Sequence, residues 1–287
     1  MPANQLIYYA NRLDPDFEEL LVVPISDLHY GNPLFDLERL QITLRFLEKH
    51  NAYAFLNGDL VEAATKTSLG NIYQQTRSPK QQRDEVGDML EPYASRFLGA
   101  VDGNHENRIT QQSDISITED IAKRLRIPYR PEGMLHKVTF GSGLHSMRGK
   151  PFIFWFYQTH GYGGARTKSA KAIKAERVAT WIHVDFYAMS HDHVVNVAPD
   201  VYLIPSSVDF PEKDKEGNLT GHRIGYVNAH RKMLVKTNAY LRWGGYAEAG
   251  GFPPTDMATP LIKLLTPKSP YWDELPDKPR QAVKVVV

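Results

Sequence analysis

Short apolar runs divide the chain, and each is followed by a polar cluster. Residues 20–25, Leu-Leu-Val-Val-Pro-Ile, continue without polar alternation, which predicts a strand buried on both faces. Residues two apart in an extended chain point to the same side, so Asp27 and His29 are expected to project together from the end of this strand. Similar runs predict strands over residues 52–56, 96–101, 137–140, 152–158 and 186–189.

Helical periodicity fills the intervals between these runs. It predicts helices over residues 35–49, within 60–93, and over 116–126 and 167–183. Asp36 and Ser116 stand before two of them as candidate caps. Strands that alternate with helices and end in polar clusters predict an α/β fold with its site at the carboxyl ends of the strands.

The motifs occupy only part of the chain. Residues 1–265 are expected to form a single domain, in which residues 25–194 carry the motifs and residues 195–265 supply short strands and a Gly/Pro-rich loop. That loop, residues 243–254, holds aromatic residues and is expected to be a lid or an oligomer contact. The remaining Pro-rich, charged segment, residues 266–287, is expected to be a surface tail.

Composition removes several classes of protein. The formal net charge of +1 gives no general attraction to nucleic acid or to an anionic membrane, so binding to either would need a local patch. Cysteine is absent, which excludes disulfides, cysteine-held metal clusters and thiol nucleophiles. Residues 1–19 lack the apolar core of a signal peptide, and no window approaches the roughly 18 apolar residues of a membrane span. We therefore expect a cytoplasmic protein without a membrane partner.

The polar clusters carry the candidate chemistry. In chain order they are Asp27/His29, Asp59, Asn104/His105, His160 and His191/His193. Each one alone is more often a capped strand end or a turn than a metal site. Carboxylate, amide and imidazole groups are also ligands for divalent transition metals. Five such clusters after successive strands favour the metal site over the turn.

Together these clusters form a pattern of known type. The chain reads Asp27-Leu28-His29, Gly58-Asp59, Gly103-Asn104-His105-Glu106, His160-Gly161 and Ser190-His191-Asp192-His193. This order resembles the calcineurin-like metallophosphoesterase superfamily, whose blocks are D-x-H, G-D, G-N-H-[DE], H-G and G-H-x-H. The resemblance covers residues 25–194. It implies a four-layer αββα sandwich that hydrolyses a phosphate ester by attack of a hydroxide bridging two metal ions.

The resemblance also implies the metal ligands. The ligands of one divalent ion would be Asp27, His29, Asp59 and His193. Those of the second would be Asp59, Asn104, His160 and His191, so that Asp59 bridges the two ions. Manganese is expected first, and iron, zinc or nickel would also suit imidazole and carboxylate ligands.

Two further residues are implied to be catalytic. His105 follows Asn104 and is no ligand in the superfamily, so it would protonate the leaving group or stabilise charge on the phosphoryl group. Glu62 stands where a related branch carries the carboxylate that orients this histidine and keeps it charged.

Departures from the pattern separate the branches of the superfamily. The protein Ser/Thr phosphatases carry an Asp-Arg pair after G-D-x-V and an Arg before G-N-H-E, whereas this chain has Glu62-Ala63 and Asp102 there. Its His191-Asp192-His193 block is similar to the branch of nucleases, cyclic-nucleotide phosphodiesterases and small-molecule phosphoesterases. Ser190 replaces the usual Gly of that block, which is tolerable if its backbone φ is negative.

Several cations could contact substrate phosphate. The planar guanidinium of Arg108 suits that group. Tyr162 and Arg166 follow His160 closely and are further candidates for substrate binding. Lys171, Lys174 and Arg177 share one helical face, which either grips a phosphate backbone or is simply solvated. The solvated face is the favoured alternative.

The expected function is hydrolysis of phosphodiester bonds in nucleic acid or nucleotides. One alternative is a phosphomonoesterase acting on a small metabolite. Another is a metal-containing protein that binds nucleic acid or assembles with partners without turnover. The expected partner is a phosphate-ester substrate, and the oligomeric state is left open.

Overall fold

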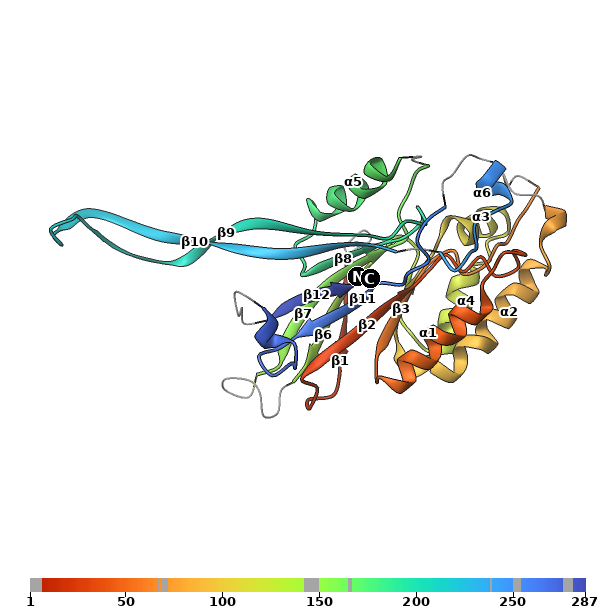
Figure 1. Cartoon of the computed structure of the whole chain (residues 1–287), viewed down its shortest axis with the longest axis horizontal. Coiled ribbons are helices and arrows are strands. Elements are labelled where there is room, and N and C mark those ends of the chain that lie inside the picture. Colours follow the sequence, from red (N-terminus) through yellow and green to blue (C-terminus); the bar gives the residue numbers. More distant parts are fainter. Residues whose placement is uncertain are drawn as a thin grey trace.

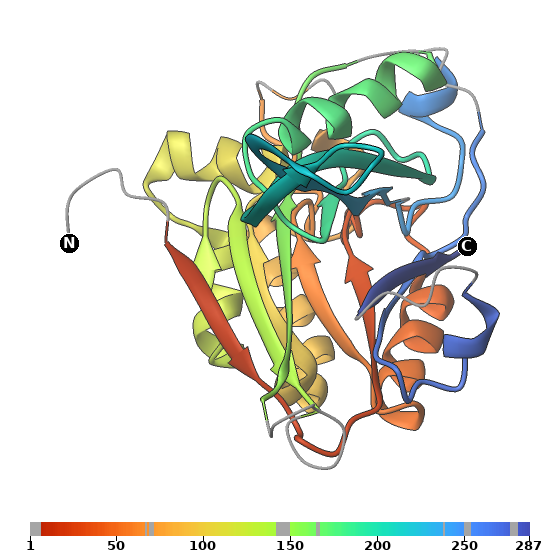
Figure 2. The same ribbon diagram turned by 90° about the vertical axis from the view of Figure 1, so that its left-hand side faces the viewer.

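Two mixed sheets face one another in the protein (Figures 1 and 2). The structure is a computed structural model and describes residues 7–66, 68, 72–141, 150–164, 167–237, 239–249, 254–275 and 281–287. In order, one sheet contains β12 (Ala282–Val286), β11 (Leu261–Leu265), β2 (Glu19–Ile25), β3 (Tyr53–Asn57), β4 (Phe97–Val101) and β5 (Tyr129–Arg130). The other contains β1 (Tyr8–Arg12), β6 (Met134–Phe140), β7 (Phe152–Thr159), β8 (Phe186–Met189), β10 (Leu219–Lys236) and β9 (Asn196–Lys213).

Helices cover the outer faces of the two sheets unequally. The helices are α1 (Leu37–Lys49), α2 (Pro79–Leu90), α3 (Asn104–Ser113), α4 (Ile117–Leu125), α5 (Lys168–Ala179) and α6 (Tyr246–Ala249), with short 3₁₀ turns η1 (Ile72–Gln74), η2 (Glu91–Arg96) and η3 (Trp272–Glu274). Helices α1, α2 and α4 cover the sheet that contains β2 to β4, whereas α5 packs against β8 and β10 of the other (Figure 1). The expected α/β sandwich is therefore confirmed, with a fourth layer of one long helix.

The interior of the sandwich explains the aromatic composition of β7. Its alternating burial directs Phe152, Phe154 and Phe156 inward, where they meet Phe55 of β3 and Phe186 of β8 in one buried cluster. Burying side chains of this kind contributes about 1.5–3 kcal/mol each. The two sheets are thereby fixed against one another, so groups carried on their ends keep a constant separation.

Strand direction brings the polar clusters to one edge. Strands β2, β3 and β4 are mutually parallel, and so are β7, β8 and β10. Their carboxyl ends carry the five clusters of the sequence pattern. The predicted strand ends are correct to within a residue, because each buried run stops where its polar cluster begins.

The C-terminal half differs from its prediction in two places. Instead of short strands, β9 and β10 are 18 residues each and pair as a ribbon that projects from the body (Figure 1). Residues 266–287 are no surface tail, since β12 pairs with β11 and Trp272 is buried. The open edge of β11 accounts for this, because it offers unpaired backbone groups to the last strand.

One long stretch is less helical than expected. Between β3 and α2, the described part of residues 60–78 forms loops and the short turn η1 rather than a helix. Helix α2 begins only at Pro79, where the Ser78 hydroxyl accepts from Gln81 N and the Gln81 side chain accepts from Ser78 N. Across the described residues, no helix is long and apolar enough to cross a membrane.

Candidate metal centre

The expected ligands lie on turns rather than on extended chain. Asp27, His29, Asp59, His191 and His193 all have positive φ, between 48° and 71°. Asp and His enter this left-handed region more readily than branched residues, yet each such residue costs about 1–3 kcal/mol. The prediction that Asp27 and His29 project from extended chain is therefore wrong, because β2 ends at Ile25, before these two residues.

Backbone hydrogen bonds between neighbouring loops hold these turns. Asp27 N donates to Gly58 O at 2.9 Å, and His29 N donates to Asp59 O at 3.0 Å. The two loops after β2 and β3 thus run side by side like a short extra ladder. This pairing compensates for the strained backbone and brings the first two clusters together.

Glu106 is the central clamp of the site. Its fully buried carboxylate accepts from the backbone N–H groups of Asp59, Leu60, Val61 and Gly103 at 2.6–3.1 Å. Gly103 must be glycine, because a Cβ there would lie 2.1 Å from Asp59 N. Burial, together with the charges of Asp59 and Asp102, raises the pKa of Glu106 to about 7. The clamp fixes the β3 loop against the start of α3.

Four acceptor atoms converge between β3, β7, β8 and α3. His160 Nδ1 lies 2.8 Å from Asn57 O and His191 Nε2 lies 2.6 Å from Gly163 O, so each of these nitrogens donates and the other ring nitrogen faces the site. Those inner nitrogens are 3.3 Å apart and lie 3.1 Å and 2.8 Å from Asn104 Oδ1. His160 Nε2 is also 3.2 Å from Asp59 Oδ2.

A second group of acceptors adjoins the first and shares Asp59. His193 Nε2 lies 3.2 Å from both His29 Nε2 and Asp27 Oδ1. His29 Nε2 is 3.8 Å from Asp59 Oδ2. Asp27 Oδ1 is buried and makes no hydrogen bond of normal geometry among the described residues. Acceptors packed in this way repel one another unless positive charge lies between them.

The pKa values of two histidines and of Asp59 also indicate that positive charge is stabilised at this site. Burial alone would lower the pKa of His160, but the charge of Asp59 and its hydrogen bond outweigh burial and raise it to about 10. Burial likewise opposes the charged form of His29, but its contact with the acceptor carboxylate of Glu62 and the charge of Asp59 raise its pKa to about 9. Although burial opposes ionisation of Asp59, the charge of His160 and its hydrogen bond to Asp59 hold the pKa of Asp59 well below the usual range.

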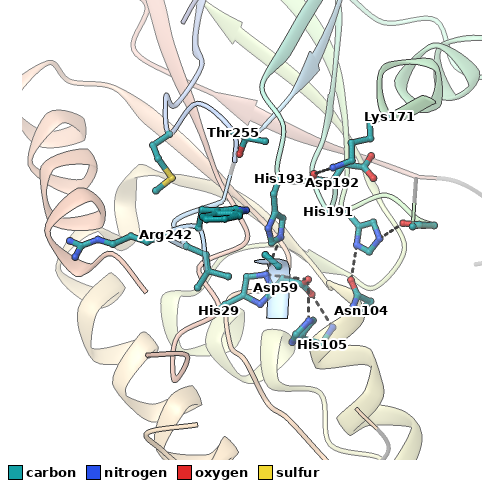
Figure 3. A pocket seen from close by; sticks show the side chains of 16 residues that line it. His29, Asp59, Asn104, His105, Lys171, His191, Asp192, His193, Arg242 and Thr255 are labelled. Carbon is teal, nitrogen blue, oxygen red and sulfur yellow. Dashed lines mark hydrogen bonds and ion pairs between the residues drawn. The ribbon is translucent and has the colours of Figure 1, made fainter. Parts of the chain in front are cut away.

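The donor set therefore fits two divalent cations. Among the described residues, three groups have their ligand atoms within 4.8 Å of one another: Asp27 with His29 and His193, Asp59 with His160 and His191, and His29 with Glu62 and His105. The first two belong to the two ligand sets implied by the sequence, and Asn104 joins the second of these through its amide oxygen. The outer ring nitrogens of His160 and His191 already donate to the carbonyls of Asn57 and Gly163, which is the arrangement that orients metal-binding histidines. The close-up in Figure 3 shows five of the candidate ligands around one opening: His29, Asp59, Asn104, His191 and His193.

His105 and Glu62 do not pair as expected. His105 Nδ1 lies 2.6 Å from the backbone carbonyl of Glu62, so this nitrogen donates and Nε2 faces inward, 3.9 Å from Asp59 Oδ2. The Glu62 carboxylate instead lies 3.3 Å from His29 Nδ1 and accepts from Asn32 Nδ2 at 3.2 Å. Burial lowers the pKa of His105 to about 4, so it is neutral rather than held in the charged form.

Ser190 gains a structural role from its hydroxyl. Its φ is not positive, as its tolerance requires. Asn57 Nδ2 donates to Ser190 Oγ at 2.6 Å and to Thr159 O at 2.9 Å. Thr237 Oγ1 lies 2.8 Å from both Ser190 Oγ and Ser26 Oγ. This buried network joins the ends of strands from both sheets directly beneath the ligands.

The expected substrate-binding residues are not brought together at the opening. Arg108 Nε donates to Asn104 O at 3.3 Å, its Nη1 donates to Ser68 Oγ, and its side chain does not line the cavity. Tyr162 is 45% exposed and likewise stands outside the lining. Arg166 lies outside the described residues.

The basic face of α5 is divided: Arg177 is exposed, as expected of a solvated face, whereas the two lysines of the face are not. Lys171 and Lys174 are buried, and their Nζ atoms donate to Asp192 O at 2.9 Å and Asp192 Oδ1 at 2.7 Å. Lys236 Nζ donates to the other carboxylate oxygen, Asp192 Oδ2. These lysines hold the residue between His191 and His193. The sequence contained both partners but gave no sign of their pairing.

A cavity of about 250 Å³ opens over the ligands (Figure 3). One side is formed by expected site residues, among them His29, Asp59, Asn104, His105, His191 and His193. The other side comes from a region without motifs and contains Leu241, Arg242, Trp243, Ala247, Thr255 and Met257. The only sequence signal for this side was the Gly/Pro-rich, aromatic loop.

Comparisons with known proteins give a remote likeness only. No family model matches the chain, and no curated protein sequence matches it. Similar solved structures include an uncharacterised, predicted phosphoesterase from Streptococcus pneumoniae (12% identity, TM-score 0.34, 86% of this chain and 82% of that one). Others are GAP50, the anchor in the inner membrane complex of Plasmodium (10%, 0.46, 86% and 82%), and a metallophosphoesterase from Sphaerobacter thermophilus (11%, 0.36, 93% and 89%).

The Glu106 clamp is testable through stability. Glu106→Gln turns one acceptor into a donor that faces backbone N–H groups, so we expect unfolding free energy to fall by roughly 1–3 kcal/mol. Urea denaturation measures it. Glu119→Gln, at an exposed helical ion pair, is the matched control and should change stability by less than about 0.5 kcal/mol. Equal losses of unfolding free energy in both variants would contradict a stabilising role for the Glu106 hydrogen bonds.

The contact between Glu62 and His29 predicts an effect on metal affinity. Glu62→Gln removes the charge that orients His29, so we expect affinity for Mn²⁺ to fall roughly 10–100-fold. Isothermal titration measures it. Unchanged affinity combined with a lower kcat at saturating metal would instead support the pairing of Glu62 with His105.

Proposed function

We propose that this protein is a metallophosphoesterase of the calcineurin-like superfamily that hydrolyses phosphodiester bonds with two divalent metal ions, manganese first. One observation carries the proposal. Seven candidate ligands from separate strand ends converge as two groups of acceptors that share Asp59. A turn or a structural histidine cluster needs no such convergence, because its polar atoms can pair as donor and acceptor.

The chain's own residues divide the work at this site. Asp59 lies between the two ligand groups, and Asn104 contributes an oxygen without adding negative charge near an anionic substrate. When bound, the two cations would activate a water molecule as nucleophile and neutralise the phosphate oxygens. Glu106 and Ser190 hold the loops that carry these ligands, so the site is organised before substrate arrives.

His105 is the proposed general acid. Its Nδ1–H is committed to the Glu62 carbonyl, which leaves Nε2 facing the cavity. A neutral imidazole must first take up a proton at Nε2 before it can donate one. The negative phosphate of a bound ester favours that uptake, since a nearby anion stabilises the imidazolium. The proton can then pass to the leaving oxygen.

A small diester is the favoured substrate. The cavity of about 250 Å³ is below the roughly 300–1,000 Å³ of pockets that hold drug-sized ligands, which favours nucleotides over duplex nucleic acid. Lys171 and Lys174 of α5 are already engaged by Asp192, so these two lysines supply no track for a polymer backbone. The cations that line the cavity, Lys171 and Arg242, are also engaged, and a diester carries less charge to neutralise than a monoester. A small phosphomonoester is the second candidate, because the cavity size suits it equally.

The first test is hydrolysis of bis-p-nitrophenyl phosphate against p-nitrophenyl phosphate in Mn²⁺. We expect the diester to be preferred. His105→Ala should retain both metals and lose kcat by roughly 10²–10⁴-fold, because the leaving group is no longer protonated. Preference for the monoester would select the second candidate. Bound metal without turnover of either ester would support a binding protein instead.

The shared ligand gives a second test. Asp59→Ala removes the carboxylate that lies near ligands of both groups, so we expect loss of most bound manganese and of all turnover. Elemental analysis after gel filtration measures the metal. Asp88→Ala, at an exposed position on α2, is the control and should keep both. Full metal content in Asp59→Ala would contradict the assignment.

A further inference from the structure

The side of the cavity opposite the ligands has its own structure. It is built by the described residues 241–249 and 254–257, here named the C-terminal wall, with lining residues Leu241, Arg242, Trp243, Ala247, Thr255 and Met257. This segment lies beyond residues 25–194, so the five blocks say nothing about it. Any substrate specificity that this segment confers is therefore independent of the five blocks.

Backbone hydrogen bonds fix the start of the wall against the metal centre. Tyr240 N donates to Asp27 O at 3.0 Å, and Asp36 N donates to Tyr240 O at 2.8 Å. Arg242 N then donates to Leu34 O at 2.9 Å. The residue before the wall is thus bonded directly to the backbone of a candidate metal ligand, which sets the distance across the cavity.

Arg39 of α1 fastens both ends of the segment. Its Nη1 donates to Ala239 O at 2.6 Å and its Nη2 to Thr259 Oγ1 at 2.8 Å. The guanidinium also lies 4.6 Å from the centre of the Tyr240 ring. Since α1 is packed into the core, the C-terminal wall is anchored at both ends to the same helix.

The two sides of the cavity differ in chemistry. The ligand side consists of carboxylates, an amide and imidazoles, which suit phosphate and cations. On the wall, Leu241, Ala247 and Met257 are apolar, and Trp243 keeps 47% of its surface exposed. An indole held partly open to a cavity offers a flat surface on which a planar ring can stack. Base–aromatic stacking of this kind contributes about 1–3 kcal/mol per base.

We propose that the C-terminal wall binds the organic part of the substrate, that Trp243 stacks on an aromatic ring there, and that the substrate is a nucleotide-sized ester. This rests on the proposed function for the phosphate end. The cavity extends from the ligands to the wall, so a nucleotide-sized ester with its phosphate at the ligands would place its base at the wall. The metal site then determines the reaction, and the wall determines which esters enter.

The test compares two ligands that differ only in the base. AMP and ribose 5-phosphate are titrated into the manganese-loaded protein by calorimetry, which needs no turnover. We expect AMP to bind roughly 5- to 100-fold more tightly in the wild type because of stacking. Trp243→Ala should abolish the difference by weakening AMP alone, and Trp243→Phe should keep most of it because a planar ring remains.

Controls distinguish failure of the base site from failure of the proposed phosphodiesterase function. Trp181→Ala, at a position 69% exposed and outside the cavity, should leave the preference for AMP unchanged. Equal affinities for the two ligands in the wild type, or a preference retained in Trp243→Ala, would overturn the wall as a base site even if diester hydrolysis is found. Absence of binding by both ligands together with absence of hydrolysis would overturn the proposed function as well.

Discussion

The geometry of the site depends on one buried carboxylate. Glu106 gathers four backbone N–H groups from two separate loops, at Asp59 to Val61 and at Gly103. These donors have no strand partner at the ends of β3 and β4, and buried N–H groups left unpaired would each cost about 1–3 kcal/mol. By satisfying all of them, Glu106 lets Asp59 and Asn104 approach one another on left-handed and helical backbone that neither loop would adopt alone.

A second constraint is electrostatic, because like-charged or unpaired groups must be neutralised both at the opening of the site and in the layer beneath it. At the opening, imidazole and carboxylate groups face one another, and positive charge between them is stabilising. Beneath the opening, Asp192 is a buried anion, and its ion pairs with Lys174 and Lys236 neutralise its charge. A buried carboxylate that lost its partners would be strongly destabilising. The lysines therefore hold the turn that aims His191 and His193, and they are unavailable for substrate.

The parts of the molecule that depend on local sequence pattern could be predicted from the sequence. The apolar runs located β2, β3, β4, β7 and β8, and the residues after them are the groups that converge. It could not foresee which way the Glu62 side chain turns, because His29 and His105 are both within reach. Nor could it pair the α5 lysines with Asp192, or bring Trp243 to the cavity, since these contacts join distant segments. Pro199, Pro205 and Pro211 hid the length of β9; they are tolerated because β9 is an edge strand.

The ribbon of β9 and β10 has a consequence for how the fold opens. Near its base, residues 233–236 of β10 pair with β8 as well as with β9, so their amides are held within a sheet. Farther out, residues 203–213 and 219–229 pair with one another and with no third strand of the described chain, and a lone two-stranded hairpin is marginally stable in water. Hydrogen exchange along the ribbon should consequently form a gradient, fast at the turn near Gly217 and slow at its base. Amides a few residues from the ligands would then report opening of the whole sandwich, while those at the tip report only local fraying.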